Sequence, residues 1–340
     1  MTHPIQRRRL LNGMAGLTSL ALLPASRNVR AQAPSGPVVL YTSNNAQSVE
    51  AVQTVARQKL PGVKISTITG GSGQLLRRAQ AEAAKPQGDI FWSGSAGTLA
   101  AFNELYEPYQ SPEAATIPAE LRHPQNLWTA TNLHVVVAML NTRQFGGAPA
   151  PKTWKDLLSP AFKGKIIIAD PANSSTAFVI LWGVDKLLGA DALRALAANT
   201  TVTSAASTVL RSVGQGEFAV GLTYESNAYA YVAGGQREIR LLYPEDGTFV
   251  SPEFGALLKG APGGATARAA FDLLLSRDTQ IALLENAFRR PSRSDIDVSK
   301  HVELPSIDKV KRFAIDESEA AKGRDEFLKR WQSYASATTK

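Results

Sequence analysis

The chain has 340 residues, of which 44% are hydrophobic and 19% charged, so it has enough apolar residues for one or two globular domains. It has no cysteine, which excludes disulfides, thiolate metal sites and cysteine nucleophiles. The formal net charge is +8, but residues 1–33 carry five arginines and no acidic residue, which leaves +3 for residues 34–340. A charge this small suits a small anionic ligand and does not indicate a nucleic-acid partner.

Residues 1–33 have the order of an export signal. The arginine triplet 7–9 is followed by two leucines, as in a twin-arginine signal, and a weakly apolar stretch continues to Leu23. Small residues follow, and we expect cleavage near Ala31 or Ala33. A disordered basic tail is the alternative interpretation. Because no cysteine follows to carry a lipid, the pattern predicts an exported soluble protein, located in the periplasm.

The chain after the signal alternates strand-like and helix-like patterns. Strands are expected over 37–41, 63–69 and 89–92, with apolar residues at helical spacing between them. This alternation predicts an α/β fold with a mostly parallel sheet, in which ligands bind at the carboxyl ends of the strands. Polar loops fall at three such ends and supply the candidate ligand-binding residues Ser43, Asn44, Asn45, Gly71, Ser72 and Ser93. Turn chemistry explains any one of these loops, but three in register favour a site.

A second region repeats the strand-helix order, which predicts a second α/β lobe. Its expected strands are 133–140, 166–168 and 218–223, its expected helices are 191–198 and 204–216, and 154–164 is irregular. Long strands at 133–141 and 248–258 would be the two crossings between the lobes. We therefore assign 34–137 plus 250–300 to lobe 1 and 138–249 plus 301–340 to lobe 2. The final stretch, 306–334, is predicted to be helical and to dock on a lobe.

The stretch from Asp170 to Phe178 connects a predicted strand to a predicted helix. Pro171 cannot donate to a strand ladder, and the Asn, Ser and Thr residues at 173–176 are typical of helix starts. The free amides of a helix start, together with the positive end of the helix dipole, suit an anion. An ordinary helix cap is the alternative interpretation.

Several segments, taken in order, resemble the iron(III)-type substrate-binding proteins of bacterial ABC importers. The matching segments are 39–43, 88–93, 154–164, 170–178, 213–218 and 289–291. The resemblance implies a type II periplasmic binding protein, with two α/β lobes joined by two hinge strands and a ligand cleft between them. It also implies a monomer that closes over its ligand and delivers it to a membrane permease.

The resemblance departs from the family at the metal site. Iron-binding members hold the metal with one His, one Glu and two adjacent Tyr. By position these ligands fall on Asn45, Gly94, Glu225 and Ser226, and none keeps its ligand type. An alternative iron(III) site would use the phenolates of Tyr224, Tyr229 and Tyr231.

The anion half of the family's site is kept, because its phosphate-holding helix start falls on Ser175, Thr176 and Ala177. This pattern is similar to the branch that takes hexose phosphates or 2-aminoethylphosphonate. It implies a small organic solute that carries its own phosphate or phosphonate, bound without a metal or cofactor. Glu225 would then accept hydrogen bonds from sugar hydroxyls or pair with an amine.

An enzyme, for example a secreted phosphatase, is the rival class. The four histidines are scattered without metal-ligand spacing, and there is no Gly-x-Ser-x-Gly elbow, Walker loop or Gly-x-Gly-x-x-Gly motif. A phosphatase needs a metal cluster or a nucleophile with a base, and the sequence supplies neither pattern. We therefore expect a binding protein and no enzyme.

Overall fold

The computed structural model describes residues 33–147 and 149–337. The chain divides into two units, 1–33 and 34–340, and the described helices and strands belong to the second. The predicted export signal and its cleavage sites lie outside the described residues, apart from Ala33.

The first lobe is built on three parallel strands. Its elements are β1 (Gly36–Thr42), α1 (Ala46–Lys59), β2 (Val63–Thr69), α2 (Ser72–Ala81), β3 (Ile90–Trp92) and α3 (Ala96–Ala100). β1 pairs in parallel with β2 on one side and β3 on the other, so their carboxyl ends lie at one edge. The strand-helix alternation predicted from the sequence is therefore confirmed for this lobe, with β2 at the predicted bounds.

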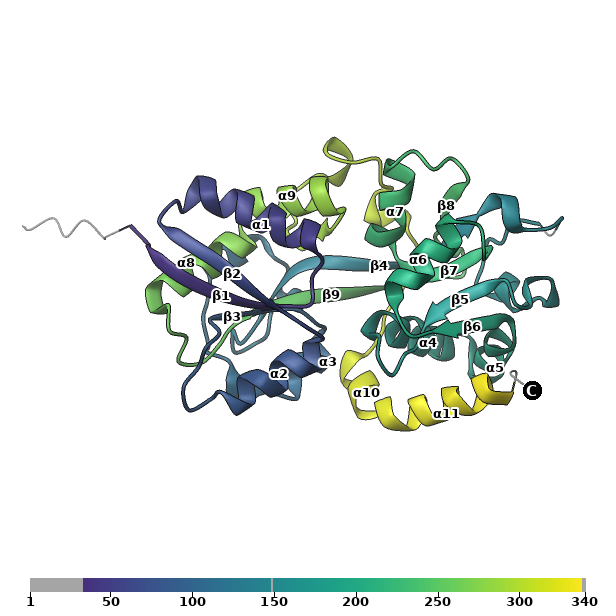
Figure 1. Ribbon diagram of the computed structural model, residues 1–340, viewed down its shortest axis with the longest axis horizontal. Coiled ribbons are helices and arrows are strands. Elements are labelled where there is room, and N and C mark those ends of the chain that lie inside the picture. Colours follow the sequence, from purple (N-terminus) through teal and green to yellow (C-terminus); the bar gives the residue numbers. More distant parts are fainter. Residues whose placement is uncertain (1–32, 148, 338–340) are drawn as a thin grey trace, which may run out of the picture. The chain divides into compact units, whose positions relative to one another are not determined.

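Two long antiparallel strands, β4 (Thr129–Asn141) and β9 (Thr248–Leu257), connect the two lobes. β9 pairs with β3 of the first lobe, and β4 pairs with β7 (Val220–Tyr224) of the second. Figure 1 shows these two strands running side by side between the two groups of elements. The predicted crossing strands are confirmed, and β4 begins four residues earlier than expected.

The second lobe repeats the parallel arrangement. Its further elements are β5 (Ile166–Ala169), α4 (Ser175–Leu188), α5 (Ala190–Asn199), β6 (Thr200–Thr203), α6 (Ala206–Gly214), α7 (Glu225–Ala233) and β8 (Ile239–Leu242). β5 pairs in parallel with both β6 and β7. Gly183 lets α4 approach β9, because a Cβ at this position would lie 2.6 Å from the ring of Phe249. This close packing holds the middle of α4 against the crossing strand β9.

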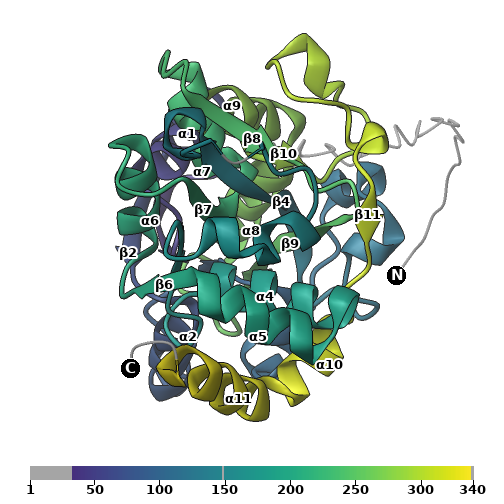
Figure 2. The ribbon, with the colours of Figure 1, turned by 90° about the vertical axis from the view of Figure 1, so that its right-hand side faces the viewer.

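The C-terminal part of the chain returns to both lobes. Its elements are α8 (Gly264–Leu275), α9 (Arg277–Ala287), β10 (Arg290–Pro291), β11 (Arg312–Phe313), α10 (Glu317–Lys322) and α11 (Arg324–Ala337). The apolar residues of α8 and α9 pack in the first lobe's core. α11 lies against α5 of the second lobe, as Figure 2 shows. The prediction of a helical stretch from 306 is wrong at its start, since β11 pairs with β9 before α10 begins.

The hydrophobic cores follow the two lobes. One cluster is drawn from 136–249 together with Ala320, Phe327 and Trp331. Two others are drawn from 38–130 and 254–283. The eleven strands among the described residues belong to one sheet whose main order is β2-β1-β3-β9-β4-β7-β5-β6. The lobe boundaries assigned from the sequence remain our proposal.

Candidate ligand-binding site

Three serines predicted from the polar loops meet at the carboxyl edge of the first lobe. Ser72 Oγ lies 2.6 Å from Ser93 Oγ and donates to Ser43 Oγ at 3.4 Å, and Ser43 and Ser93 are also hydrogen-bonded. They come together because Ser43 and Ser93 follow the neighbouring strands β1 and β3, while Ser72 opens the helix after β2. The sequence thus located this cluster, and its contact with a ligand stays a prediction.

The other candidates of this lobe have different surroundings. Asn45 caps α1, accepting a hydrogen bond from the Ser48 amide at 3.0 Å. Asn44 is buried, its side-chain amide group donates to Thr42 Oγ1 at 3.1 Å, and its Oδ1 has no hydrogen-bond partner among the described residues. A Cβ at Gly71 would meet no atom within 4 Å, so the space beside this backbone is open. Asn44 and Gly71 therefore retain capacity for a ligand, whereas the side chain of Asn45 already has a structural role.

The N-terminus of α4 has two free amides. Ser174 caps the helix by accepting from the Ala177 amide at 3.2 Å, so this predicted anion donor is already used. In the part of the chain that the structure describes, the amides of Ser175 and Thr176 have no acceptor. Because α4 has 14 residues, these amides stand at the positive end of a full helix dipole. The arrangement can bind an anion.

Glu225 begins α7 and forms a buried ion pair. Its Oε2 accepts from Arg290 Nε at 2.6 Å, and its Oε1 accepts from Arg290 Nη2 at 2.7 Å and from the Tyr243 hydroxyl at 2.6 Å. Glu225 is 1% exposed. Both oxygens have protein partners, unlike the free carboxylate that the sequence led us to expect.

The three tyrosines of the alternative iron site do not share one environment. Tyr224 stacks on His134 at a centroid distance of 4.5 Å, whereas Tyr229 packs edge-on against Phe288 and Tyr231 packs on Gly214 of α6. Residues two apart on a helix do not face one another, which separates Tyr229 from Tyr231. Burial raises the pKa of both Tyr224 and Tyr229, which opposes phenolate formation.

A group of polar side chains on the crossing strands was not predicted from the sequence. We call it the polar floor, and it consists of Asn132, His134, Tyr224, Ser251 and Glu253. In the β4–β9 ladder, Asn132 is opposite Glu253 and His134 is opposite Ser251, so the four side chains share one face. Tyr224 joins this face from the end of β7. Polar residues alternating within two otherwise apolar strands were the sequence pattern that could have revealed it.

Arg289 sets the charges of the polar floor. Its Nη1 lies 2.8 Å from Nδ1 and 3.0 Å from Nε2 of His134, and burial together with Arg289 lowers the pKa of this histidine. Burial alone would raise the pKa of Glu253, but His134, Arg289 and Asn44 outweigh it and lower that pKa. The floor therefore holds a neutral imidazole beside an ionised carboxylate.

The floor connects the two sets of predicted residues. At one end, the side chain of Asn44 in the first lobe lies beside Glu253 and contributes to lowering its pKa. At the other end, the side chains of Thr176 and Ser251 lie beside the phenol of Tyr224 and act to lower its pKa, against the larger effect of burial. Asn44, which follows Ser43, and Thr176, at the start of α4, thus both border the polar floor.

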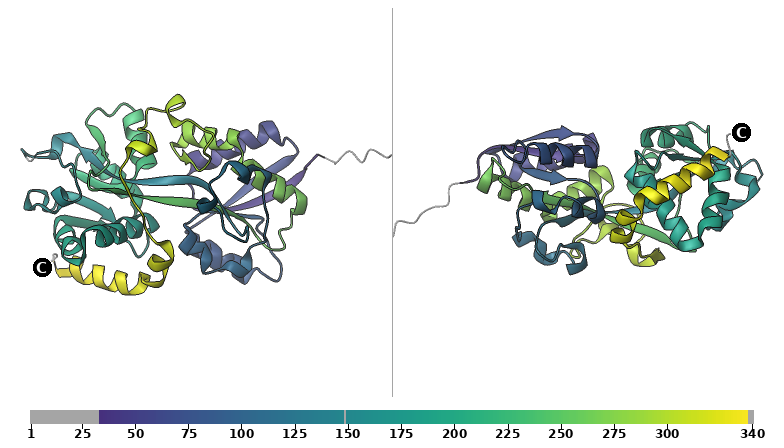
Figure 3. Two further views of the ribbon diagram at one scale, coloured as in Figure 1. Left: turned by 180° about the vertical axis from the view of Figure 1, so that it is seen from behind. Right: turned by 90° about the horizontal axis from the view of Figure 1, so that it is seen from below.

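Glu317 was also missed, because it lies far away in the sequence. Its Oε2 accepts from the backbone amide of Gly97 at 3.2 Å, and its Oε1 accepts from Ser251 Oγ at 3.3 Å. Burial raises the pKa of Glu317, and this effect exceeds that of the hydrogen bonds, which lower the pKa. Residue 317 opens α10, which lies beside α3 in Figures 1 and 3. This carboxylate therefore reaches the floor from the C-terminal helices.

A family model described as "Bacterial extracellular solute-binding protein" matches residues 85–322. The chain belongs to this family. Among the relatives of this solute-binding protein, an uncharacterised protein of Haemophilus influenzae is 31% identical over 77% of this chain and 80% of its own length. Iron uptake protein A2 of a Synechocystis strain is 27% identical over 82% of this chain and 84% of its own.

Two further comparisons concern phosphorus-containing ligands. A Salmonella typhi protein, provisionally assigned as a 2-aminoethylphosphonate-binding periplasmic protein, is 26% identical over 72% of this chain and 74% of its own. The structure of the periplasmic binding protein AfuA from Actinobacillus pleuropneumoniae, with fructose-6-phosphate bound, superposes with a TM-score of 0.78 at 24% identity. The superposition covers 89% of this chain and 99% of AfuA. It supports the two-lobe fold of type II periplasmic binding proteins.

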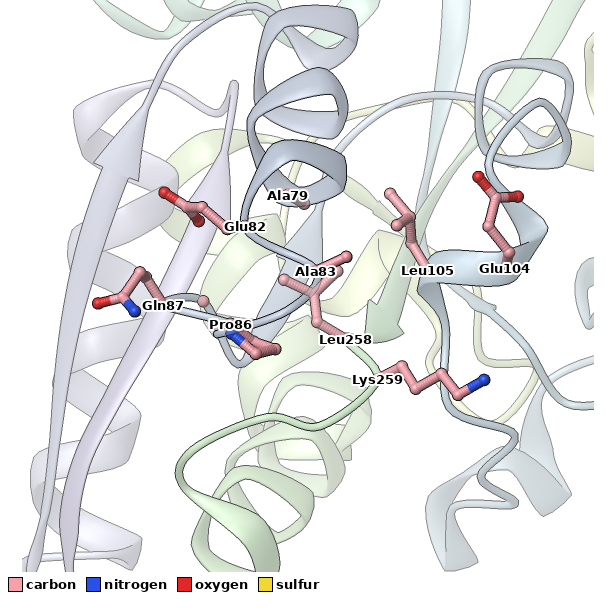
Figure 4. A pocket seen from close by; sticks show the side chains of 10 residues that line it. Ala79, Glu82, Ala83, Pro86, Gln87, Glu104, Leu105, Leu258 and Lys259 are labelled. Carbon is pink, nitrogen blue, oxygen red and sulfur yellow. The ribbon is translucent and has the colours of Figure 1, made fainter.

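Two hollows of the solute-binding protein lie away from the predicted site residues. One, of about 70 Å³, lies between α2 and the end of β9, with Glu82, Leu258 and Lys259 in its wall (Figure 4). The other, of about 650 Å³, lies between α11 and the end of β5, with Asp170 and Trp331 in its wall. Within 33–147 and 149–337, no group of three His, Cys, Asp or Glu is placed to hold a metal, and no helix is long and apolar enough to span a membrane.

Proposed function

We propose that this chain is the periplasmic solute-binding component of an ABC importer that captures a small organic phosphate or phosphonate. The observation that carries the proposal is the pair of free amides at Ser175 and Thr176, at the positive end of α4. Thr176 also borders the polar floor through Tyr224, so an anion held there would lie beside other ligand-binding groups.

The proposed site has contributions from both lobes and from the strands between them. The anion lies on α4, and the organic part contacts the floor together with Ser43, Asn44, Ser72 and Ser93. We assign Glu225 a supporting role, because Arg290 and Tyr243 already bind its oxygens. A ligand that contacts both lobes favours the closed arrangement, and the closed form is then presented to a membrane permease. No covalent step is involved.

Two relatives support a phosphorus-containing ligand, namely the proteins whose names or structures carry 2-aminoethylphosphonate and fructose-6-phosphate. The iron uptake relative supports a ferric ligand instead. The geometry favours the first, because Tyr224, Tyr229 and Tyr231 have separate surroundings and burial opposes ionisation of two of them. Export through the twin-arginine-like signal and a monomeric state are parts of the same proposal.

A thermal-shift screen tests the proposal. The purified protein is melted with glucose 6-phosphate, 2-aminoethylphosphonate, inorganic phosphate or ferric citrate. A ligand at a hundred times its Kd adds about 2.7 kcal/mol to the free energy of unfolding and raises the Tm. We expect a shift with an organic phosphate or phosphonate and none with iron. A shift with ferric citrate alone, with tyrosinate colour, would overturn the proposal.

A further inference from the structure

We infer that the ligand is a zwitterion whose amine lies against Glu253, with Glu317 adding negative charge nearby, while its phosphate or phosphonate lies on α4. The inference rests on the proposed function, and it chooses between the two ligand types that this function admits. An aminoalkyl phosphonate, or the phosphate ester of an amino alcohol, has the required charges, whereas a hexose phosphate lacks the cation.

Glu253 is the first reason. It is 6% exposed, and its Oε2 has no hydrogen-bond donor at normal distance among the described residues. His134 Nε2 lies 3.8 Å away, too far for a good hydrogen bond, and this ring is neutral. A buried carboxylate oxygen without a donor is costly unless a partner arrives. An ammonium group supplies both the missing donor and the opposite charge.

Glu317 adds a second negative charge near Tyr224, while Gly97 and Ser251 already bind its two oxygens. The charges of Glu317 and Glu253 both act on the phenol of Tyr224 and raise its pKa in addition to burial. The ionisable groups that influence one another here are two carboxylates, the guanidinium of Arg289, the neutral His134 and the protonated phenol. This set has a net charge of about −1 when both carboxylates are ionised, which attracts an ammonium group and repels a second anion.

The anion site lies close enough for one small molecule to use both. Thr176 of α4 lies beside the Tyr224 phenol, and so does Ser251, whose hydroxyl donates to Glu317. The Tyr224 phenol borders both Thr176, at the anion-binding end of α4, and Ser251, which binds Glu317. We therefore expect a short ligand with opposite charges at its two ends.

Isothermal titration calorimetry with a matched ligand pair tests the inference. 2-Aminoethylphosphonate and 2-hydroxyethylphosphonate share the anion and the chain length, and differ only in the amine. We expect the amine to bind at least about tenfold more tightly, the scale of a charge-assisted hydrogen bond in a desolvated site. Phosphoethanolamine against ethylene glycol monophosphate repeats the comparison for phosphate esters.

Variants assign the preference to the two carboxylates. Glu253→Gln keeps the shape of the side chain, and we expect it to cut the amine preference below about threefold. Glu317→Gln gives a second route should Glu253→Gln not fold. Glu120→Gln is the matched control, because Glu120 is exposed and has no partner among the described residues, and it should keep the wild-type preference.

The outcomes separate the inference from the proposed function. Equal affinity for both members of each pair overturns the inference and leaves the proposed function standing. The inference is also overturned, and the proposed function kept, if glucose 6-phosphate binds while 2-aminoethylphosphonate and phosphoethanolamine do not. If no phosphorus-containing ligand binds at all, the proposed function fails together with the inference.

Discussion

Arg290 binds both carboxylate oxygens of Glu225, at 2.6 and 2.7 Å, with each side chain only 2% exposed. Such a pair joins the start of α7 to β10, which belong to parts of the chain 65 residues apart. The geometry is bidentate, which is the strongest arrangement for these two groups. Glu225 thus stabilises the fold beside the site, and a ligand would have to displace Arg290 or Tyr243 to reach it.

Glu225→Ala should destabilise the protein more than it changes ligand choice. It leaves the Arg290 guanidinium buried without its partner, which typically costs roughly 3–5 kcal/mol. Urea denaturation measures the loss in the free energy of unfolding. Glu50→Ala is the control, since it breaks the exposed pair with Arg57 and should leave the stability unchanged. If the Glu225→Ala protein is as stable as the wild type but prefers different ligands, Glu225 contacts the ligand directly.

Thr176→Pro should weaken binding of every phosphorylated ligand. Proline removes the Thr176 amide hydrogen, while the first turn of a helix tolerates it. Loss of one hydrogen bond to a charged group predicts a ten- to hundredfold weaker Kd, at about 1.5–3 kcal/mol. Ser175→Pro tests the neighbouring amide in the same way, at the position after the Ser174 cap.

Thr176→Val is the control for the proline variants, because it keeps the amide and removes the hydroxyl. Calorimetry gives the Kd and far-UV circular dichroism checks the fold. If Thr176→Pro and Ser175→Pro both bind an organic phosphate normally, the anion is not held at α4.

Gly97→Ala should disturb the contact between α3 and α10. A Cβ at residue 97 would lie 2.6 Å from the carbonyl oxygen of Glu317 and 3.2 Å from the Cβ of Ala321. Relieving this overlap by moving backbone costs about 1–3 kcal/mol. The change also lengthens the Gly97–Glu317 hydrogen bond, so we expect a lower Tm and weaker ligand binding.

Gly73→Ala is the matched control for Gly97→Ala. Its Cβ would meet only Arg77 Nη1, at 3.4 Å, and alanine favours the helix there. Differential scanning calorimetry should show an unchanged or raised Tm for this variant. A Gly97→Ala protein as stable as Gly73→Ala would show that α10 moves freely away from α3.

The stability should fall as the pH drops below about 6.5, the usual pKa of an unfolded histidine. Burial and Arg289 lower the pKa of His134, so the unfolded chain binds a proton that the folded chain does not. The pKa of Glu253 is also lowered by folding, so protonation of this group continues the loss of stability at more acidic pH. The pKa of Glu317 is raised by folding, so its protonation acts in the opposite direction and adds stability as the pH falls.

His134→Gln removes this titration and keeps an acceptor for Arg289. The pH dependence between about 7 and 5.5 should become flatter than in the wild type when both are unfolded in urea at each pH. His123 also has a pKa lowered by burial, so His123→Gln is the comparison that separates the two histidines. An unchanged slope in His134→Gln would mean that His134 is charged in the folded protein.

Local patterns were enough to predict most of the fold. The run Ile166–Ile168 and the apolar strand before Ser43 show their strand character in the residues themselves, and Ser174 and Asn45 cap helices where polar residues precede helical spacing. The elements that were not predicted include β6, β8, α8, α9, β10 and β11. The two-residue strands β10 and β11 have no periodicity of their own, because they depend on pairing with β4 and β9.

The site was less predictable for the same physical reason. The serine cluster follows from strand order, which the alternation of strands and helices already predicts. The partner of Glu225 is 65 residues away and the partner of Glu317 is 220 residues away, so no local pattern could assign them. The polar floor depends on the register of β4 against β9, which places His134 opposite Ser251.

Calorimetric titration of the purified protein with 2-aminoethylphosphonate tests the central claim most directly. A phosphonate held by the amides of Ser175 and Thr176, with its amine on Glu253, predicts saturable binding at one site per chain. The same titration with Thr176→Pro should give a Kd at least about tenfold higher. Absence of binding by every phosphorus-containing ligand, with saturable binding of ferric iron and a tyrosinate absorption band, would contradict the claim.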